Sequence, residues 1–135
     1  PEVEDEGIVI YGRSIGAALG ALVAVERPPA GLLLHTPPIN IASYAMRYGA
    51  PPILIRHPFR TDRALEKLGN VPILIISHDN DSLVPPRHST RLREIARHAE
   101  YIEVGGTHNA YATPEDEIAF EQAVANFIRE TIGPG

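Results

Sequence analysis

Hydrophobic residues in this chain form four short, nearly uninterrupted runs, and longer segments with helical spacing of apolar positions separate them. Runs of this length are typical of strands that are buried on both faces of a sheet. The predicted strands are 7–11, 31–35, 71–77 and 101–104, and the predicted helices are about 15–26, 86–98 and 114–132. Strands that alternate with helices predict an α/β fold of three layers, in which a mostly parallel sheet of about four strands lies between helices.

The last predicted helix has the clearest local signals. Thr113 suits the N-cap and Pro114 the first helical position, and acidic residues follow in the first turn. The segment 36–70, in contrast, is predicted as a long loop with short helical pieces, because its prolines interrupt any long helix, and a connection this long is often functional. Its larger apolar side chains are candidates for the wall of an acyl pocket or for local packing over the sheet. They are Tyr44, Met46, Tyr48 and Phe59.

The first strand leads directly into Gly12-Arg13-Ser14-Ile15-Gly16 and then into an alanine-rich segment. A G-x-S-x-G motif between a strand and a helix predicts a nucleophile elbow, a sharp turn that holds its serine at the apex. We expect both glycines to be needed, because the backbone reverses tightly and the helix packs close to the strand. The positive end of the helix would favour a negative charge developing beside Ser14. The alternative is a glycine-rich turn in which Ser14 is only an exposed hydroxyl.

Two more candidate residues follow later strands. Asp81 lies in the loop after strand 71–77, with Asp79 as the rival acid in the same loop, and His108 lies after strand 101–104. The chain order serine, aspartate, histidine, with each residue following the C-terminal end of its own strand, is the order expected of α/β-hydrolases. Three matched elements make a stronger signal than the serine motif alone.

The chain therefore resembles the α/β-hydrolase superfamily, with its small esterase, depalmitoylase-like and serine-peptidase-like branches. The motifs that carry the resemblance are Tyr11-Gly-Arg-Ser-Ile-Gly16, Asp81-Ser-Leu-Val-Pro85 and Gly105-Gly-Thr-His-Asn109. The second motif fits the family's D-x-x-V-P pattern, which favours Asp81 over Asp79. One departure is that Asp79 follows His78 where the family often has glycine, so the turn of this loop is expected to differ.

The resemblance implies a role for each candidate residue. Ser14 would attack a carbonyl, His108 would accept the serine proton and return it to the leaving group, and Asp81 would orient the imidazole. The backbone N–H of Ile15 would supply one donor of the oxyanion hole.

The resemblance covers nearly the whole chain but only part of the family's domain. Members of the family have several strands before the elbow, and a loop among those strands donates the second oxyanion N–H. The chain opens at Pro1 without a starting methionine, so we expect residues 1–135 to be one partial domain, the C-terminal half of the fold. Strand 7–11 would then be an open apolar edge. This predicts association, either with a complementary N-terminal half or as a homodimer.

Composition narrows the remaining possibilities. The chain has 135 residues, a formal net charge of −5 and no cysteine. This length suffices for one core, mild acidity without a basic stripe argues against a nucleic-acid partner, and no apolar run has the length of a membrane span. The lack of cysteine excludes thiol chemistry and fits a reducing compartment such as the cytoplasm without requiring one.

No cofactor is expected. The loop His78-Asp-Asn-Asp81 lacks the ligand spacing of a recognised metal site. We interpret the scattered arginines as solvated surface, with recognition of an anionic substrate as the weaker alternative. The other histidines are interpreted as structural or solvated. They are His35, His57, His88 and His98.

Two classes of function compete. The first is a serine hydrolase that cleaves a carboxylic ester, thioester or amide through an acyl-enzyme, with an active site completed by further residues. The second is a non-catalytic half-domain, natural or engineered, that keeps the triad residues and works through its interfaces. Loss of one oxyanion donor typically lowers turnover about 10²–10³-fold, so residues 1–135 alone are expected to be a poor enzyme.

Overall fold

The computed structural model describes residues 7–42, 49 and 59–133. Its main sheet is parallel throughout, in the order β1-β2-β3-β4. The strands are β1 (Val9–Arg13), β2 (Gly31–His35), β3 (Ile73–His78) and β4 (Glu100–Val104). The helices are α1 (Ile15–Glu26), α4 (Thr61–Lys67), α5 (Pro86–Ile95) and α6 (Pro114–Ile132). A small antiparallel hairpin of β5 (Gly106–Thr107) and β6 (Ala110–Tyr111) follows β4.

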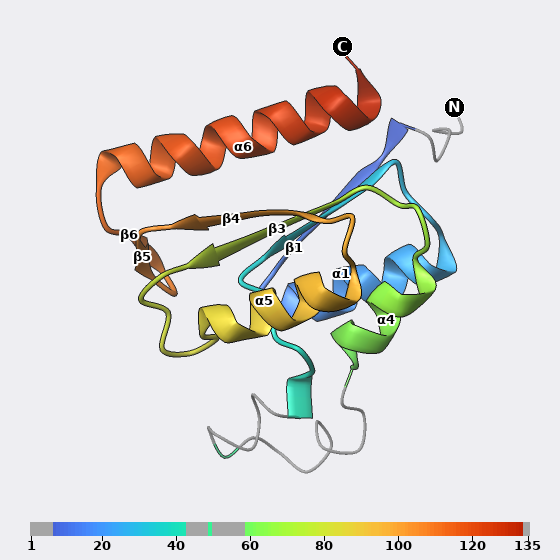
Figure 1. Ribbon diagram of the computed structural model, residues 1–135, viewed down its shortest axis with the longest axis horizontal. Coiled ribbons are helices and arrows are strands. Elements are labelled where there is room, and N and C mark those ends of the chain that lie inside the picture. Colours follow the sequence, from blue (N-terminus) through green and yellow to red (C-terminus); the bar gives the residue numbers. More distant parts are fainter. Residues whose placement is uncertain (1–6, 43–48, 50–58, 134–135) are drawn as a thin grey trace.

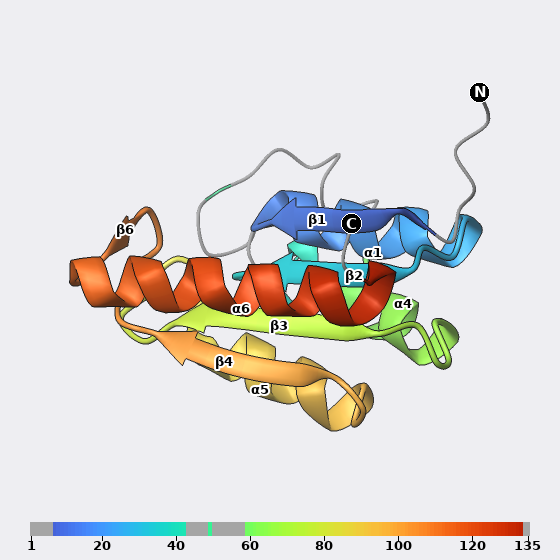
Figure 2. The same cartoon turned by 90° about the horizontal axis from the view of Figure 1, so that it is seen from above.

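Helices cover both faces of the sheet (Figure 1). The long helix α6 lies across one face, while α1, α4 and α5 pack against the other, and Figure 2 shows α6 running over the strands from above. The predicted α/β fold, with three layers and four parallel strands, is confirmed. None of the helices in the described part of the chain is long and apolar enough to cross a membrane.

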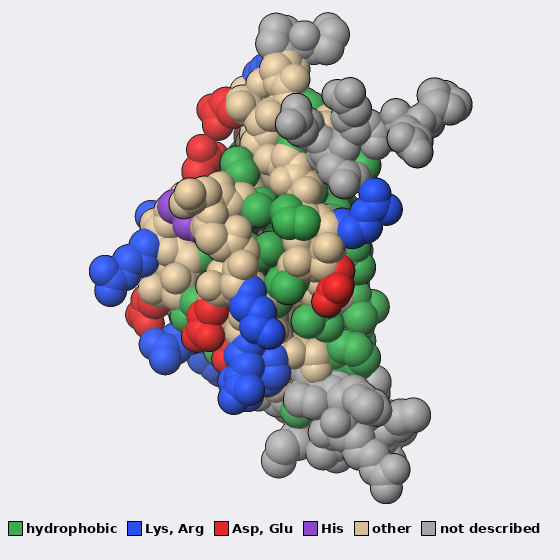
Figure 3. Space-filling model, turned by 90° about the vertical axis from the view of Figure 1, so that its right-hand side faces the viewer, with side chains coloured by type: hydrophobic (Ala, Val, Ile, Leu, Met, Phe, Trp, Pro, Cys, Tyr) green, Lys and Arg blue, Asp and Glu red, His purple; other side chains and the backbone are tan. Residues whose placement is uncertain are grey.

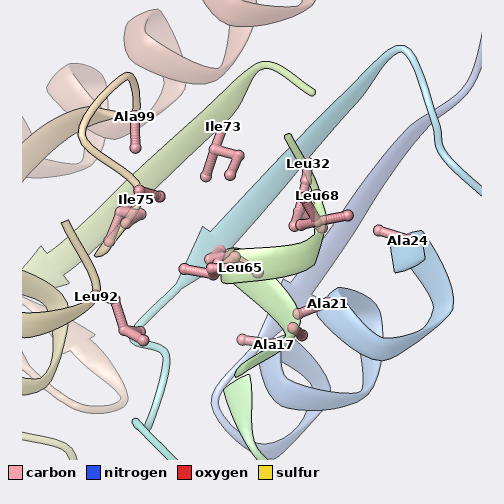
Figure 4. Packing of buried hydrophobic residues seen from close by; sticks show 13 residues of the cluster. Ala17, Ala21, Ala24, Leu32, Leu65, Leu68, Ile73, Ile75, Leu92 and Ala99 are labelled. Carbon is pink, nitrogen blue, oxygen red and sulfur yellow. The ribbon is translucent and has the colours of Figure 1, made fainter. Parts of the chain in front are cut away.

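Two hydrophobic clusters lie on opposite faces of the sheet. Strands β2 and β3 are buried at every position. Their side chains alternate, so that Leu32 and Ile73 join the cluster under α1, α4 and α5 (Figure 4), while Leu33 and Leu74 join the cluster under α6. A strand with helices on both sides favours apolar residues on both of its faces. This explains why the sequence runs were continuous rather than alternating.

Small residues bring α1 close to β1. Ala17, Ala21 and Ala24 are fully buried, and a Cβ added to Gly20 would lie 3.3 Å from Ile10 Cγ2. Larger side chains on this face would push the helix away from the strand that leads into Ser14.

The element boundaries agree with the sequence predictions except in a few places. Strand β1 is shifted by two residues, and α5 ends at Ile95 rather than near 98 because the chain turns so that Ala96 and Ala99 enter the core. Helix α6 has the predicted bounds, and Thr113 forms a capping box with Asp116. The short hairpin β5–β6 was not foreseen.

Candidate active site

Ser14 is the single residue between the end of β1 and the start of α1. Its backbone has φ 54° and ψ −122°, a conformation that costs a residue with a side chain about 1–3 kcal/mol. The Ser14 N–H donates to the carbonyl of His35 at 2.8 Å, and the Ser14 carbonyl accepts from the N–H of Ala17 at 2.9 Å. These bonds hold the sharp turn that the motif predicted. Ile15 begins the helix, so its N–H has no acceptor within α1.

Close packing requires only the first glycine of the motif. A Cβ on Gly12 would overlap the carbonyl oxygen of Gly16 and lie 2.7 Å from the Cα of Ala17. A Cβ on Gly16 would meet nothing within 4 Å. The expectation that both glycines are needed is therefore wrong for Gly16, and the second close approach is made one helical turn later by Gly20.

This difference gives a matched pair of variants. We expect Gly12→Ala to lower the free energy of unfolding by about 3 kcal/mol, because the atoms that it meets belong to the backbone and cannot move aside. Gly16→Ala is expected to be neutral or to stabilise by about 0.5–1 kcal/mol, because alanine is the better helix former. Urea unfolding measures both. Equal losses in the two variants would contradict the packing seen at the elbow.

His108 and Asp81 are joined by a hydrogen bond in the loops after β4 and β3. His108 Nδ1 lies 2.7 Å from Asp81 Oδ2, and the side chain of Asp81 is fully buried. The other carboxylate oxygen accepts the N–H groups of Leu83 at 2.9 Å and Val84 at 2.8 Å. Asp81 therefore acts as an acceptor from three directions, and a neutral His108 that donates from Nδ1 keeps Nε2 free to accept a proton.

Asp79, the rival acid, is used elsewhere. Its Oδ1 accepts the backbone N–H of Gly106 at 2.9 Å. This contact holds the hairpin that carries His108 but does not reach the imidazole. Of the two acids in the loop, the structure thus brings Asp81 to His108.

Arg13 connects the elbow to the histidine loop. Its Nη2 donates to the carbonyl of His108 at 2.7 Å and to Asn109 Oδ1 at 3.2 Å. The loops that carry the three candidate residues follow the C-terminal ends of β1, β3 and β4 at the same end of the sheet (Figure 1). Both Ser14 and His108 are among the described residues, and no hydrogen bond joins their side chains. Such bonds are often long before substrate binds.

Several solved structures that share this architecture are peptidases or an esterase. The chain superposes with a TM-score of 0.80 on the Pyrococcus horikoshii acylaminoacyl peptidase, at 10% identity over 100% of this chain and 25% of that one. A Mycobacterium tuberculosis puromycin-hydrolyzing peptidase superposes with a TM-score of 0.79, at 16% identity over 98% of this chain and 23% of that one. The chain has part of the α/β-hydrolase fold. The esterase domain of a Rhodothermus marinus protein shares it as well, with a TM-score of 0.75 and 15% identity over 93% of this chain and 62% of that one.

Comparisons at the level of sequence say less about function than the structural ones. No family model matches the chain. An uncharacterized protein of Mycobacterium tuberculosis is 31% identical over 96% of this chain. The chain spans 47% of the length of that curated relative.

A line of hydrogen bonds through two buried histidines runs beneath the candidate site. The hydroxyl of Tyr11 lies 2.7 Å from His35 Nδ1, and His35 Nε2 lies 2.8 Å from His78 Nε2. His78 Nδ1 lies 2.6 Å from the carbonyl oxygen of Thr107, the residue before His108. The two histidines are 3% and 2% exposed, so they belong to the interior. They line a small cavity of about 160 Å³ together with Arg13 and other residues of the elbow and hairpin.

On sequence grounds His35 is interpreted as structural or solvated, and His78 is considered only as part of a loop that departs from the family pattern and lacks the spacing of a metal site. A usable signal was present, because His35 and His78 each end a buried apolar run, and neighbouring parallel strands end side by side. His35 pairs with Ile76 in the sheet register, and His78 lies two residues after Ile76 along β3. This register brings the rings of His35 and His78 together. The register itself depends on tertiary packing and could not be obtained from the sequence.

Burial and the nearby His78, Arg13 and His108 lower the pKa of His35 from 6.5 to about 3. The unfolded chain therefore takes up this proton at a higher pH than the folded one. The stability that comes from neutral His35 is fully present above pH 6.5 and is lost as the pH falls toward 3.

We expect the free energy of unfolding to fall by up to about 1.4 kcal/mol per pH unit through this group in that window. His35→Gln cannot titrate, so this part of the pH dependence should disappear. Urea unfolding of both proteins at pH 7 and pH 5 measures the difference. The exposed His98→Gln serves as the control and should keep the wild-type slope. Identical slopes in wild type and His35→Gln would contradict the burial argument.

Some residues considered from the sequence have no described position. Tyr44, Met46, Tyr48 and His57 lie outside the described residues. Within residues 7–42, 49 and 59–133, no group of three or more histidine, aspartate or glutamate side chains is arranged to hold a metal ion.

Proposed function

We propose that this chain carries the catalytic residues of a serine hydrolase that cleaves a carboxylic ester, thioester or amide through an acyl-enzyme. Ser14 is the nucleophile, His108 is the general base and acid, and Asp81 orients His108. The observation that carries the proposal is the buried 2.7 Å bond between His108 and Asp81, in loops at the same end of the sheet as the strained Ser14 turn.

The geometry supports a specific sequence of proton transfers and of bonds formed and broken. Asp81 stays ionised and accepts a hydrogen bond from the Nδ1–H of His108, so Nε2 accepts the proton of the Ser14 hydroxyl as Oγ attacks the substrate carbonyl carbon. The carbonyl oxygen becomes an oxyanion, and the backbone N–H of Ile15 at the positive end of α1 donates to it. His108 then protonates the departing alcohol, thiol or amine. Water repeats the steps on the acyl-enzyme and releases the acid.

The substrate class is proposed at the level of the bond that is cleaved. The proteins that share this fold are named as an acylaminoacyl peptidase, a puromycin-hydrolyzing peptidase and an esterase, and for this reason we leave both amide and ester bonds in the proposed substrate class. Because the chain spans under half of its curated relative, we propose that residues outside it supply the second oxyanion donor and much of the substrate pocket.

A fluorophosphonate probe tests the proposal directly. The probe reacts with activated serines, and peptide mapping with intact mass measurement identifies the modified residue and the length of the labelled polypeptide. We expect one adduct, on Ser14. Folded protein that forms no adduct would favour the second candidate function, a non-catalytic half-domain that keeps these residues.

The observation that favours this alternative is the open edge of the sheet. Strand β1 has a partner only on the side of β2 among the described strands, so one row of its backbone groups has no strand beside it. Apolar side chains gather next to this edge, and Figure 3 shows such side chains along one border of the molecule. Those on the outer side of β1 and α1 are Tyr11, Ile15, Leu19 and Val23, with exposed fractions of 38–53%.

We propose that this edge pairs with additional polypeptide, either a complementary N-terminal half or a second copy. Residues 1–135 alone are then expected to associate at micromolar concentration, and sedimentation velocity measures this. Val23→Lys should weaken association, because it places a charge in the exposed apolar surface beside β1. Ile118→Lys on α6 is a matched control, since Ile118 is 50% exposed and Val23 is 53% exposed. A dispersed monomer would count against the proposal.

A further inference from the structure

The loop that carries His108 is held on both sides of that residue by side chains from other strands. His78 Nδ1 lies 2.6 Å from the carbonyl oxygen of Thr107, which belongs to the peptide group before His108. Arg13 Nη2 donates at 2.7 Å to the carbonyl of His108, which belongs to the peptide group after it. We propose that His78 and Arg13 form a clamp that positions His108 for its reaction with Ser14. This proposal rests on the proposed function.

Fixing the two peptide groups restricts the direction of the side chain between them. The planes of successive peptides are related only by φ and ψ of the residue that they share, and these angles set the direction of its Cα–Cβ bond. The bond to Asp81 alone leaves the imidazole free to move with its loop. The clamp ties that loop to β1, which leads into Ser14, and to β3, which leads into Asp81.

The hydrogen bonds beneath the clamp determine which nitrogen of His78 carries the proton. The Thr107 carbonyl can only accept, so His78 must donate from Nδ1. In a neutral ring, Nε2 of His78 is then an acceptor, and the 2.8 Å contact requires His35 to donate from its own Nε2. Nδ1 of His35 consequently accepts from the Tyr11 hydroxyl. The three bonds run in one direction, from Tyr11 through His35 and His78 to the Thr107 carbonyl.

This order assigns separate roles to the residues. His78 and Arg13 contact the backbone on either side of His108 and are positioning residues. His35 and Tyr11 act one step further away, because they keep His78 in the tautomer that donates to Thr107. Both histidines are buried, and hydrogen bonds in a low-dielectric interior are stronger than the same bonds in water.

Two pairs of variants test the clamp in the full-length protein. Asn and Leu have nearly the same size, but only Asn can donate from the position of His78 Nδ1, so His78→Asn should restore much of what His78→Leu removes. In the same way Arg13→Lys keeps a donor that Arg13→Met lacks, and Arg13 is exposed, so this pair is expected to fold. The control is His98→Leu, because His98 also contacts a backbone carbonyl, that of Val71 at 2.8 Å, but far from the site.

Two readouts are used. The first is the rate of Ser14 labelling by the fluorophosphonate probe, where His78→Leu and Arg13→Met should each be roughly 10- to 100-fold slower than wild type. The second is nuclear magnetic resonance of the histidine rings. We expect His78 as the Nδ1–H tautomer, His35 as the Nε2–H tautomer, and a His108 Nδ1 proton signal that weakens in the Leu and Met variants and returns in the Asn and Lys variants.

The outcomes separate the clamp from the proposed function. Unchanged labelling and an unchanged His108 signal in His78→Leu and Arg13→Met would overturn the clamp, as would an Asn variant that behaves like its Leu partner in both readouts. If wild-type Ser14 is never labelled, the proposed function fails, and the His108 signal alone then decides whether the clamp exists. Slower labelling in His98→Leu would show that the losses are not specific to the clamp and would also overturn it.

Discussion

Replacing Ser14 with alanine is expected to abolish the fluorophosphonate adduct and any burst of product from an activated ester. Alanine keeps the backbone conformation and removes only the oxygen, so the fold should remain. The expected loss in turnover is on the order of 10⁶-fold. The members of a triad act as a unit, so removing the nucleophile alone costs about as much as removing all three. Intact mass and stopped-flow absorbance measure the two effects.

Two further variants make this result specific. Ser82→Ala removes an exposed hydroxyl one residue from Asp81 and should leave the adduct in place. Ser14→Gly should also abolish the adduct, but it relieves the positive φ of 54° and should stabilise the fold by roughly 1 kcal/mol or more. An adduct that persists in Ser14→Ala would show that another residue reacts and would remove Ser14 from the triad.

Asp81→Asn is expected to lower turnover by about 10⁴-fold while leaving the geometry of the loop largely intact. The amide can still accept a backbone N–H where the carboxylate accepted those of Leu83 and Val84. Its NH₂ group would face His108 Nδ1, however, and would force the ring proton onto Nε2. His108 would then present a proton, not a lone pair, to Ser14.

Asp79→Asn is the matched control for this prediction. Asp79 lies in the same loop and its side chain accepts the N–H of Gly106, so an amide there should preserve that bond and cost much less activity. Steady-state turnover of an activated ester compares the two. Equal losses would show that the effect comes from the charge of the loop and not from the tautomer of His108.

The sequence was sufficient for the fold because the central strands are buried on both faces. The uninterrupted apolar runs that become β2 and β3 leave no doubt about burial, and the alternation with helices leads to a parallel sheet. The signals at Thr113 and Pro114 are equally local, and α6 begins where they predict. The turn at Ser14 also follows from nearby residues, since a strand and a helix lie directly on either side of it.

Predictions that depended on how closely the elements pack against one another were less successful. The sequence motif of the elbow does not reveal which of its glycines is crowded. The crowded glycine is Gly12, and the next close approach is made by Gly20 and not by Gly16. The end of α5 and the short β5–β6 hairpin also escaped prediction. Both depend on which side chains reach the core and on which backbone groups find partners, and these are properties of the packed structure.

The sequence by itself determined the order of the elements, the edge position expected for the first strand, and the three candidate residues Ser14, Asp81 and His108, because each of these depends on a local pattern. Only the tertiary structure showed that Asp81, which the sequence pattern favours, contacts His108 while Asp79 accepts the N–H of Gly106, and that Tyr11, His35 and His78 form one line of hydrogen bonds. The physical reason is that parallel strands place residues from distant parts of the chain side by side. The register between those strands is set by packing across the whole sheet.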